Sequence, residues 1–298
     1  KYIKSIDFDL IIFHTTFMSF RWWGGEDFFQ NKIIKKCEFF ISSAAQKAIM
    51  PQDEWIHTSY LVKFVNILKI NQVFSVAPQS EWKKIYSGVE FNKVQFYQIL
   101  TGYIDDNLLN KINKIKEQGV TKSVDIGYRA FKSPPWLGSH GFLKTKIADV
   151  FLKKTAKSKL TVNISTDPKD VFMGDGWYQF LLKCKYFIGV EGGSTIIDPD
   201  GSIWKKGDEF TKNNPDASFT EVEKACFPNM DGNLNLIVLS PRHLEACFTN
   251  TCQVLIEGDY NGILNPHEHY IPLKKDFSNI DDVLVSISND NLRENIVK

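Results

Sequence analysis

The chain has 298 residues, of which 43% are hydrophobic and 24% are charged, and these are proportions typical of a folded globular protein. Lysine and arginine number 36 against 35 aspartates and glutamates, so the formal net charge is +1. Proteins that bind nucleic acid usually carry a basic excess, and this balance therefore excludes nucleic acid as the main partner.

The five cysteines are irregularly spaced and form no CxxC pair, which argues against a zinc site or a disulfide framework. The pattern favours reduced thiols in a cytosolic protein. No apolar run approaches the roughly 18–20 residues of a membrane span, and no signal peptide is recognisable. The chain starts without a methionine, so one interpretation is that it is a piece of a longer protein.

Short apolar runs alternate with longer amphipathic stretches, which is the pattern of βα units. In the first part, strands are predicted at 8–13, 48–50 and 72–76, and helices at 31–43, 59–68 and 105–118. In the second part, strands are predicted at 123–128, 160–164, 186–190, 235–239 and 253–256, and helices at 144–154, 175–184 and 241–248. Two such sets predict an α/β protein with two Rossmann-like domains, residues 1–110 and 111–298.

Ligands of open α/β sheets bind beyond the carboxyl ends of the strands, so the residues that follow each strand are candidates for a site. His14 follows the first strand, and an imidazole suits a general base or a hydroxyl-binding group. The alternative for His14 is a capping role. Asp53 and Glu54 follow the second strand, and only one of two adjacent carboxylates is expected to face a site; the alternative is a solvated turn. His14 and Asp53 are therefore candidates for catalysis.

Two cations follow the first strand of the second set. Arg129 comes directly after this strand, and Lys144 lies at the start of the next predicted helix. Such a pair can hold an anionic phosphate between them, and a helix N-terminus adds backbone donors. The alternative is two solvated surface cations.

The segment 188–195 is the most informative local feature, because a strand ends there in Glu191, Gly192, Gly193 and Ser194. The glycines allow a ligand to approach the backbone closely, and the N–H groups of such a turn can cradle an anion. The alternative is a tight strand-to-helix turn. The nearby sequence 198–200 has the spacing of a DxD metal motif, but Pro-Asp-Gly is an ordinary turn, and we predict no bound metal.

Two further candidates lie near the end of the second set. Glu245 falls in the first turns of a helix that begins at Pro241, and Asn261 lies in the polar stretch that follows the last strand. A carboxylate in this region can accept hydrogen bonds from a ribose diol. The alternative for Glu245 is a favourable interaction with the helix dipole.

These stretches resemble a family of bacterial glycosyltransferase-like proteins, of the GT-B type and labelled family 1, found among surface-polysaccharide genes. The resemblance extends over nearly the whole chain. It rests on 13–15 (FHT), 51–54 (PQDE), 100–106 (LTGYIDD), 125–129 (DIGYR), 136–138 (WLG), 174–177 (GDGW), 189–194 (GVEGGS), 240–246 (SPRHLEA), 269–273 (HYIPL) and 276–279 (DFSN).

The resemblance implies two Rossmann-like domains facing a cleft, with a nucleotide-sugar donor in the C-terminal domain and a saccharide or lipid-linked saccharide acceptor in the N-terminal one. It implies no cofactor and no metal, because basic side chains neutralise the diphosphate. Glu245 resembles a glutamate that binds the donor ribose. This sequence differs from those transferases at Ile237, where they carry a second glutamate that contacts the donor sugar. Glu191 is the candidate that could replace this glutamate.

The implied mechanism holds the diphosphate at Gly192 and Gly193, with Arg129 and Lys144 offsetting its charge, while His14 or Asp53 orients or deprotonates the acceptor. Two alternatives stay open: a nucleotide-sugar epimerase or hydrolase, and a non-catalytic saccharide-binding module of a larger assembly protein. The location implied is the cytoplasm, with peripheral contact at the inner face of the membrane or with a multi-enzyme assembly left open.

Overall fold

The computed structural model describes residues 6–22, 25–103 and 105–298. The chain divides into two compact units. Unit 1 holds the chain up to Ile99 together with Gly193–Ile237, and unit 2 holds Leu100–Gly192 and Val238–Lys298. The sequence predicted one division, at residue 110, and it contained no signal for the return of Gly193–Ile237 to the first unit.

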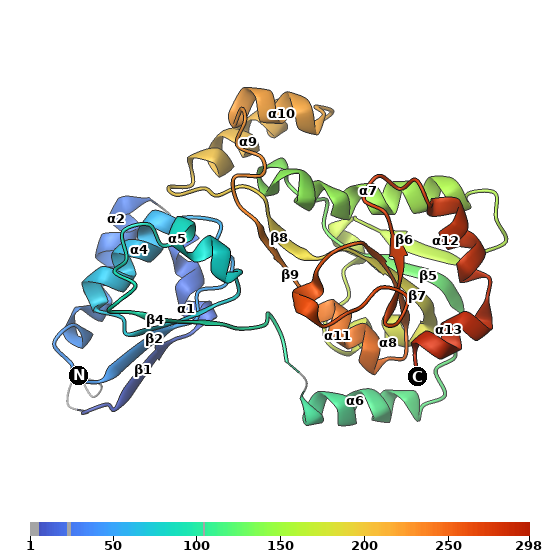
Figure 1. Cartoon of the computed structure of the whole chain (residues 1–298), viewed down its shortest axis with the longest axis horizontal. Helices are drawn as coiled ribbons and strands as arrows, with labels where there is room; N and C mark the ends of the chain where they lie inside the picture. The colour runs from blue at the N-terminus through green and yellow to red at the C-terminus, as the bar shows by residue number, and fades with distance from the viewer. Residues whose placement is uncertain (1–5, 23–24, 104) are drawn as a thin grey trace. The chain divides into compact units, whose positions relative to one another are not determined.

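Unit 1 contains a four-stranded parallel sheet in the order β1 (Leu10–Phe13), β2 (Gln46–Ile49), β3 (Gln72–Ser75) and β4 (Gln95–Gln98). Each strand lies next to the one before it, so the chain always crosses in the same direction. Because such crossovers are right-handed, every connecting helix lies on the same face of the sheet. Figure 1 shows the helices gathered on one face. They are α1 (Thr15–Met18), α2 (Glu26–Phe28), α3 (Lys35–Cys37), α4 (Thr58–Leu68) and α5 (Trp82–Ile85).

The core of unit 1 lies between this sheet and α4. The predicted helical spacing is confirmed, since Leu61, Phe64, Val65 and Leu68 are all buried on one side of α4. The ring of Phe64 meets that of Phe13 edge-on, with 5.0 Å between the ring centroids. On the opposite face of the sheet, Leu10 and Ile12 alternate with the buried residues of β1 and are half exposed.

Unit 2 contains a five-stranded parallel sheet with the order β11-β10-β7-β5-β6. Its strands are β5 (Val124–Arg129), β6 (Val162–Ser165), β7 (Cys184–Gly189), β10 (Cys252–Ile256) and β11 (Tyr270–Leu273). The chain steps from β5 to β6 in one direction and then crosses back to β7 on the other side of β5. This reversal is a topological switch point, and it opens a crevice at the carboxyl ends of β5 and β7.

Helices cover both faces of the second sheet (Figure 1). They are α6 (Asp106–Lys116), α7 (Gly138–Thr155), α8 (Asp175–Lys183), α11 (Pro241–Phe248), α12 (Ile280–Ile287) and α13 (Asp290–Ile296). The main core packs Ile147 and Phe151 of α7, Phe180 of α8 and Val283 of α12 against the apolar strands. With both faces covered, this unit is a doubly wound Rossmann-like domain.

A two-stranded sheet carries the chain between the units, formed by β8 (Gly192–Ser194) and β9 (Leu236–Val238). Along the chain, β8 is followed by α9 (Ser202–Asn213) and α10 (Phe219–Cys226) before β9 begins, and neither helix was predicted. The predicted α/β class with two Rossmann-like units is confirmed, whereas the cleft between them stays a prediction. No helix within residues 6–22, 25–103 and 105–298 combines the length and apolar character needed to cross a membrane.

Candidate functional site

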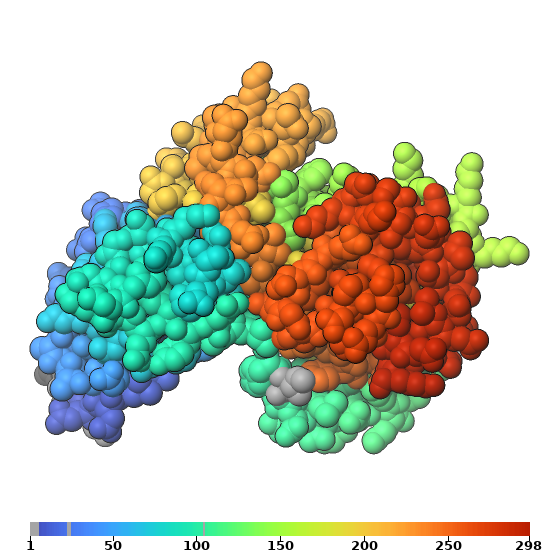
Figure 2. Space-filling model, viewed as in Figure 1, coloured from blue at the N-terminus to red at the C-terminus, as the bar shows by residue number. Residues whose placement is uncertain are grey.

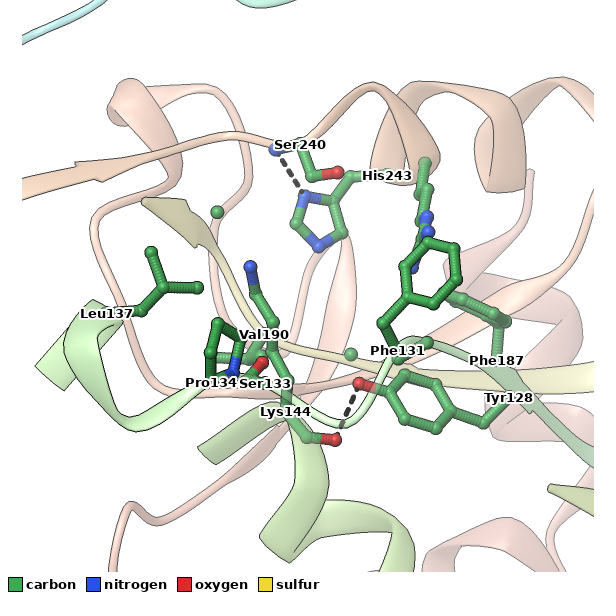
Figure 3. Close-up of a pocket in the computed structure, with 14 residues that line it drawn as sticks. Tyr128, Phe131, Ser133, Pro134, Leu137, Lys144, Phe187, Val190, Ser240 and His243 are labelled. Atoms are coloured by element: carbon green, nitrogen blue, oxygen red, sulfur yellow. Dashed lines mark hydrogen bonds between the residues drawn. The ribbon is translucent and has the colours of Figure 1, made fainter. Parts of the chain in front are cut away.

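A pocket of about 330 Å³ lies at the switch point of unit 2. Its walls come from the ends of β5 and β7 and from the first turns of α7 and α11, which is where the strand order places a ligand. The residues that line it are Tyr128, Ala130, Phe131, Ser133, Pro134, Leu137, Lys144, Phe187, Gly189, Val190, Gly192, Ser240, Arg242 and His243 (Figure 3).

Lys144 and Arg242 give the pocket two positive charges, and none of the residues lining it is acidic. The Lys144 side chain extends into the pocket in Figure 3, and its backbone carbonyl accepts the hydroxyl of Tyr128 at 2.9 Å. The guanidinium of Arg242 is held in place because Nη1 donates to the carbonyl oxygen of Arg129 at 2.8 Å. An anion is therefore the ligand that this pocket favours.

Two buried histidines fix the backbone that forms the floor of the pocket. Nδ1 of His243 accepts the N–H of Ser240 at 3.1 Å (Figure 3). Nε2 therefore carries the proton of the neutral ring, and the Val190 backbone is its hydrogen-bond partner. Nε2 of His140 lies 3.1 Å from the carbonyl oxygen of Glu191. Burial lowers the pKa of His243 to about 3 and that of His140 to about 4, so both rings are neutral at pH 7.

Glu191 is buried outside this pocket, and its carboxylate faces the loop that follows β10. Oε1 accepts the N–H of Tyr260 at 2.7 Å, and the other oxygen lies so close to Gly258 that a Cβ there would overlap it. Burial raises the pKa of the Glu191 carboxyl. Glu191 thus ties the end of β7 to the loop, and its predicted contact with the donor sugar stays a prediction.

Asn261 belongs to the same loop. Its Oδ1 accepts the N–H of Leu239 at 2.6 Å, which connects the loop to the segment between β9 and α11. Tyr260 and Asn261 both have positive φ angles, of 47° and 55°. Positive φ is unfavourable for a tyrosine, so the bonds to Glu191 and Leu239 hold a strained turn in place.

Arg129 directs its guanidinium away from the pocket. It donates to the carbonyl oxygen and Oδ1 of Asn163 and to the carbonyl oxygen of Asp170. The guanidinium carbon lies 5.0 Å and 4.6 Å from the ring centroids of Phe172 and Phe180. Arg129 therefore anchors the loop after β6. The second cation that lines the pocket with Lys144 is Arg242, which was not among the predicted site residues.

The glycine-rich segment is divided between the units. Gly192 lines the pocket, whereas Gly193 and Ser194 belong to unit 1. Gly193 has φ of +114°, and a Cβ there would overlap the carbonyl oxygen of Leu236. Ser194 is buried, and its hydroxyl bonds the carbonyl oxygen and the N–H of Ile196 at 2.9 and 3.1 Å. Among these three residues, the pocket contains only Gly192.

Glu245 lies on α11 beyond the pocket, and its Oε2 accepts the indole N–H of Trp177 at 2.8 Å. The guanidinium carbon of Arg242 lies 5.7 Å from the centroid of the same indole. Glu245 therefore orients the ring against which Arg242 rests, and its predicted bond to a ribose stays a prediction.

The other candidates lie in loops of unit 1. His14 is exposed at the end of β1 and caps α1, because its Nδ1 accepts the N–H of Thr16 at 3.3 Å. Asp53 has φ of +46°, and its carbonyl oxygen accepts Nη2 of the buried Arg21 at 2.8 Å. The neighbouring Glu54 is fully buried, and it accepts bonds from the hydroxyls of Ser75 and Tyr86.

Asp198, the first aspartate of the DxD spacing, lies in the turn before α9, which begins at Ser202. Oδ1 accepts the N–H of Gly201 at 2.9 Å, and Oδ2 accepts the N–H of Trp204 at 2.9 Å. The carboxylate thus satisfies N–H groups at the start of a helix, in agreement with the predicted turn.

No protein-family model matches the chain, and no curated protein matches it in sequence. Solved structures match it in fold. Anabaena Alr3699/HepE in complex with UDP-glucose is 11% identical at a TM-score of 0.47, over 90% of this chain and 69% of that one. TarM is 12% identical at a TM-score of 0.40, and the match covers 87% of this chain and 47% of TarM. The pneumococcal O-GlcNAc transferase GtfA in complex with UDP and GlcNAc is 9% identical at a TM-score of 0.38, and the match covers 90% of this chain and 49% of GtfA.

Proposed function

We propose that the chain is a glycosyltransferase that moves a sugar from a nucleotide-activated donor to a saccharide or lipid-linked saccharide acceptor. The observation that carries the proposal is the pocket at the switch point of unit 2, which is lined by Lys144 and Arg242 and by no acidic side chain. A dianionic diphosphate fits two cations, and the apolar wall of Phe131, Pro134 and Leu137 suits the flat face of a base.

The chemistry follows from the charge that develops when the glycosidic bond breaks. The departing diphosphate gains negative charge, and Lys144 and Arg242 stabilise it from fixed positions without the need for a metal. The bond from Arg242 to the Arg129 carbonyl holds the guanidinium before the donor binds, so little reorganisation is needed. His243 supports the pocket floor as a neutral donor. The acceptor hydroxyl is oriented or deprotonated by His14 or Asp53 of unit 1.

Calorimetric titration with UDP, the nucleotide held in the HepE structure, tests the pocket. The variants Lys144→Ala and Arg242→Ala are each expected to weaken UDP binding by about 10- to 100-fold, because each removes a charge-assisted contact worth about 1.5–3 kcal/mol. Lys146→Ala is the matched control, since Lys146 lies on the same helix outside the pocket and packs on Phe277. Equal losses in all three variants would contradict the assignment.

Transfer itself is tested by the products formed from a UDP-sugar. A glycosyltransferase releases UDP faster when a saccharide acceptor is present and yields a longer saccharide. Conversion of the sugar without an acceptor would favour the epimerase alternative, and tight UDP binding without any turnover would favour a non-catalytic module.

A further inference from the structure

A second hollow, of about 510 Å³, lies along β4 at the end of the sheet in unit 1. It is bordered by four aromatic side chains, Trp82, Phe91, Phe96 and Tyr97. Because successive side chains of a strand point to opposite faces, Phe96 and Tyr97 border the hollow from the two sides of the sheet. Residues of α5 and β4, cyan to green in Figure 2, lie at the surface in that view.

The rings are fixed before any ligand binds. The indole N–H of Trp82 donates to the carbonyl oxygen of Ala77 at 3.0 Å. Phe96 packs on Trp82 and is stacked with Phe91, with centroid distances of 5.2 and 4.7 Å. These contacts leave Phe91 37% exposed, so it presents a rigid apolar surface to the hollow at little cost in conformational entropy.

Tyr97 forms a second platform on the other side of β4. Its ring stacks on Phe74, with 5.2 Å between centroids and 19° between planes. Its hydroxyl donates to Oε1 of Gln95 at 2.8 Å. One ring face is thus occupied by Phe74, and the side chain is still 43% exposed, so its position is held while ring surface stays open to a ligand.

The polar lining determines which ligand suits these platforms. It consists of the amides of Gln79 and Gln95 and the ammonium of Lys83, and it includes no carboxylate. Each amide offers both donors and an acceptor. β4 is the last strand of the sheet, so its outer edge adds backbone N–H and C=O groups.

From these observations we propose that the hollow along β4 binds a neutral saccharide chain. A sugar ring has an apolar face of C–H groups, which packs on the electron-rich face of an aromatic ring, and a rim of hydroxyls that need donors and acceptors. The hollow supplies both kinds of surface. It lies wholly in unit 1, so it does not depend on the nucleotide pocket of unit 2.

Saturation-transfer NMR with the intact chain tests the proposal, using maltohexaose, cellohexaose, laminarihexaose and chitohexaose as probes. At least one of them is expected to receive saturation from the protein. Tyr97→Ala is expected to weaken that binding by about 10-fold, and Phe91→Ser by a similar factor, because each removes a platform. Tyr97→Phe, which keeps the ring and loses only the bond to Gln95, is expected to retain most of the affinity.

Tyr103→Ala is the matched control, because Tyr103 is 77% exposed and lies outside the hollow. Its affinity for the saccharide should equal that of the unchanged chain, and UDP binding should be unaffected in Tyr97→Ala. Saturation of none of the four probes, or equal binding by Tyr97→Ala and the unchanged chain, would overturn the proposal. Neither result would change the UDP affinities expected for the pocket of unit 2, so failure of this site is distinguishable from failure of the proposed function.

Discussion

Replacing Gly193 with alanine is expected to lower the free energy of unfolding by about 3 kcal/mol or more. Gly193 has φ of +114°, and an added Cβ would overlap the backbone carbonyl oxygen of Leu236. A backbone atom of a paired strand cannot move aside as the tip of a side chain can. The pairing of β8 with β9 would have to separate, and it carries the chain from one unit to the other.

Denaturant unfolding of Gly193→Ala beside Gly192→Ala measures this effect. A Cβ at Gly192 would lie 3.7 Å from the carbonyl oxygen of Val238, an ordinary contact, and the φ of Gly192 is not positive. The neighbouring variant should therefore lose little stability. If the two variants unfold at the same denaturant concentration, the close approach of β8 and β9 does not exist in solution.

The chain is expected to lose about 4 kcal/mol of stability between pH 7 and pH 5 through His140 and His243. Burial lowers their pKa values from 6.5 to about 4 and about 3. Between these values and 6.5 the unfolded chain binds protons that the folded chain does not. Stability from the two neutral rings is thus complete above pH 6.5 and is lost as the pH falls, by about 2 kcal/mol for each ring at pH 5.

The test is the difference between unfolding free energies measured at pH 7 and pH 5. His243→Asn should reduce this difference by about half, whatever its effect on stability at pH 7. His267→Asn is the control, because His267 is exposed and has a positive φ that asparagine tolerates. A pH dependence that His243→Asn leaves unchanged would show that this ring is not neutral and buried in solution.

The strands that carry the core could be predicted from the sequence because each is a short apolar run bounded by turn residues. β5, β7 and β10 lie within one or two residues of their predicted positions. β4 was missed because it lies at a sheet edge and has only two aromatic residues, Phe96 and Tyr97, between two glutamines, which is too short an apolar run to indicate a strand. The predicted helix at 31–43 is instead a π-helical turn, a short α-helix and a 3-10 turn in succession.

The place of the pocket beyond the strand ends could be predicted from the sequence, whereas its lining residues were predicted only in part. The sequence placed Lys144 at the start of a predicted helix and Gly192 just after a predicted strand, and both residues line the pocket. Arg242 was missed because it sits three positions before Glu245 in the same helical turn, and position along the chain does not show which of them faces a ligand. The outward turn of Arg129 depends on Asn163 and Phe172, which lie on another strand and loop.

Because the chain passes between its two units at 99–100, 192–193 and 237–238, no single cut can release either of them intact. A shortened chain that keeps only unit 2 and its pocket starts at Leu100, lacks 193–237 and joins Gly192 to Val238. The pairing of β8 with β9 keeps those two splice points adjacent, so a short turn can rejoin them. Such a minimal protein would allow UDP binding by this pocket to be measured apart from every residue of unit 1.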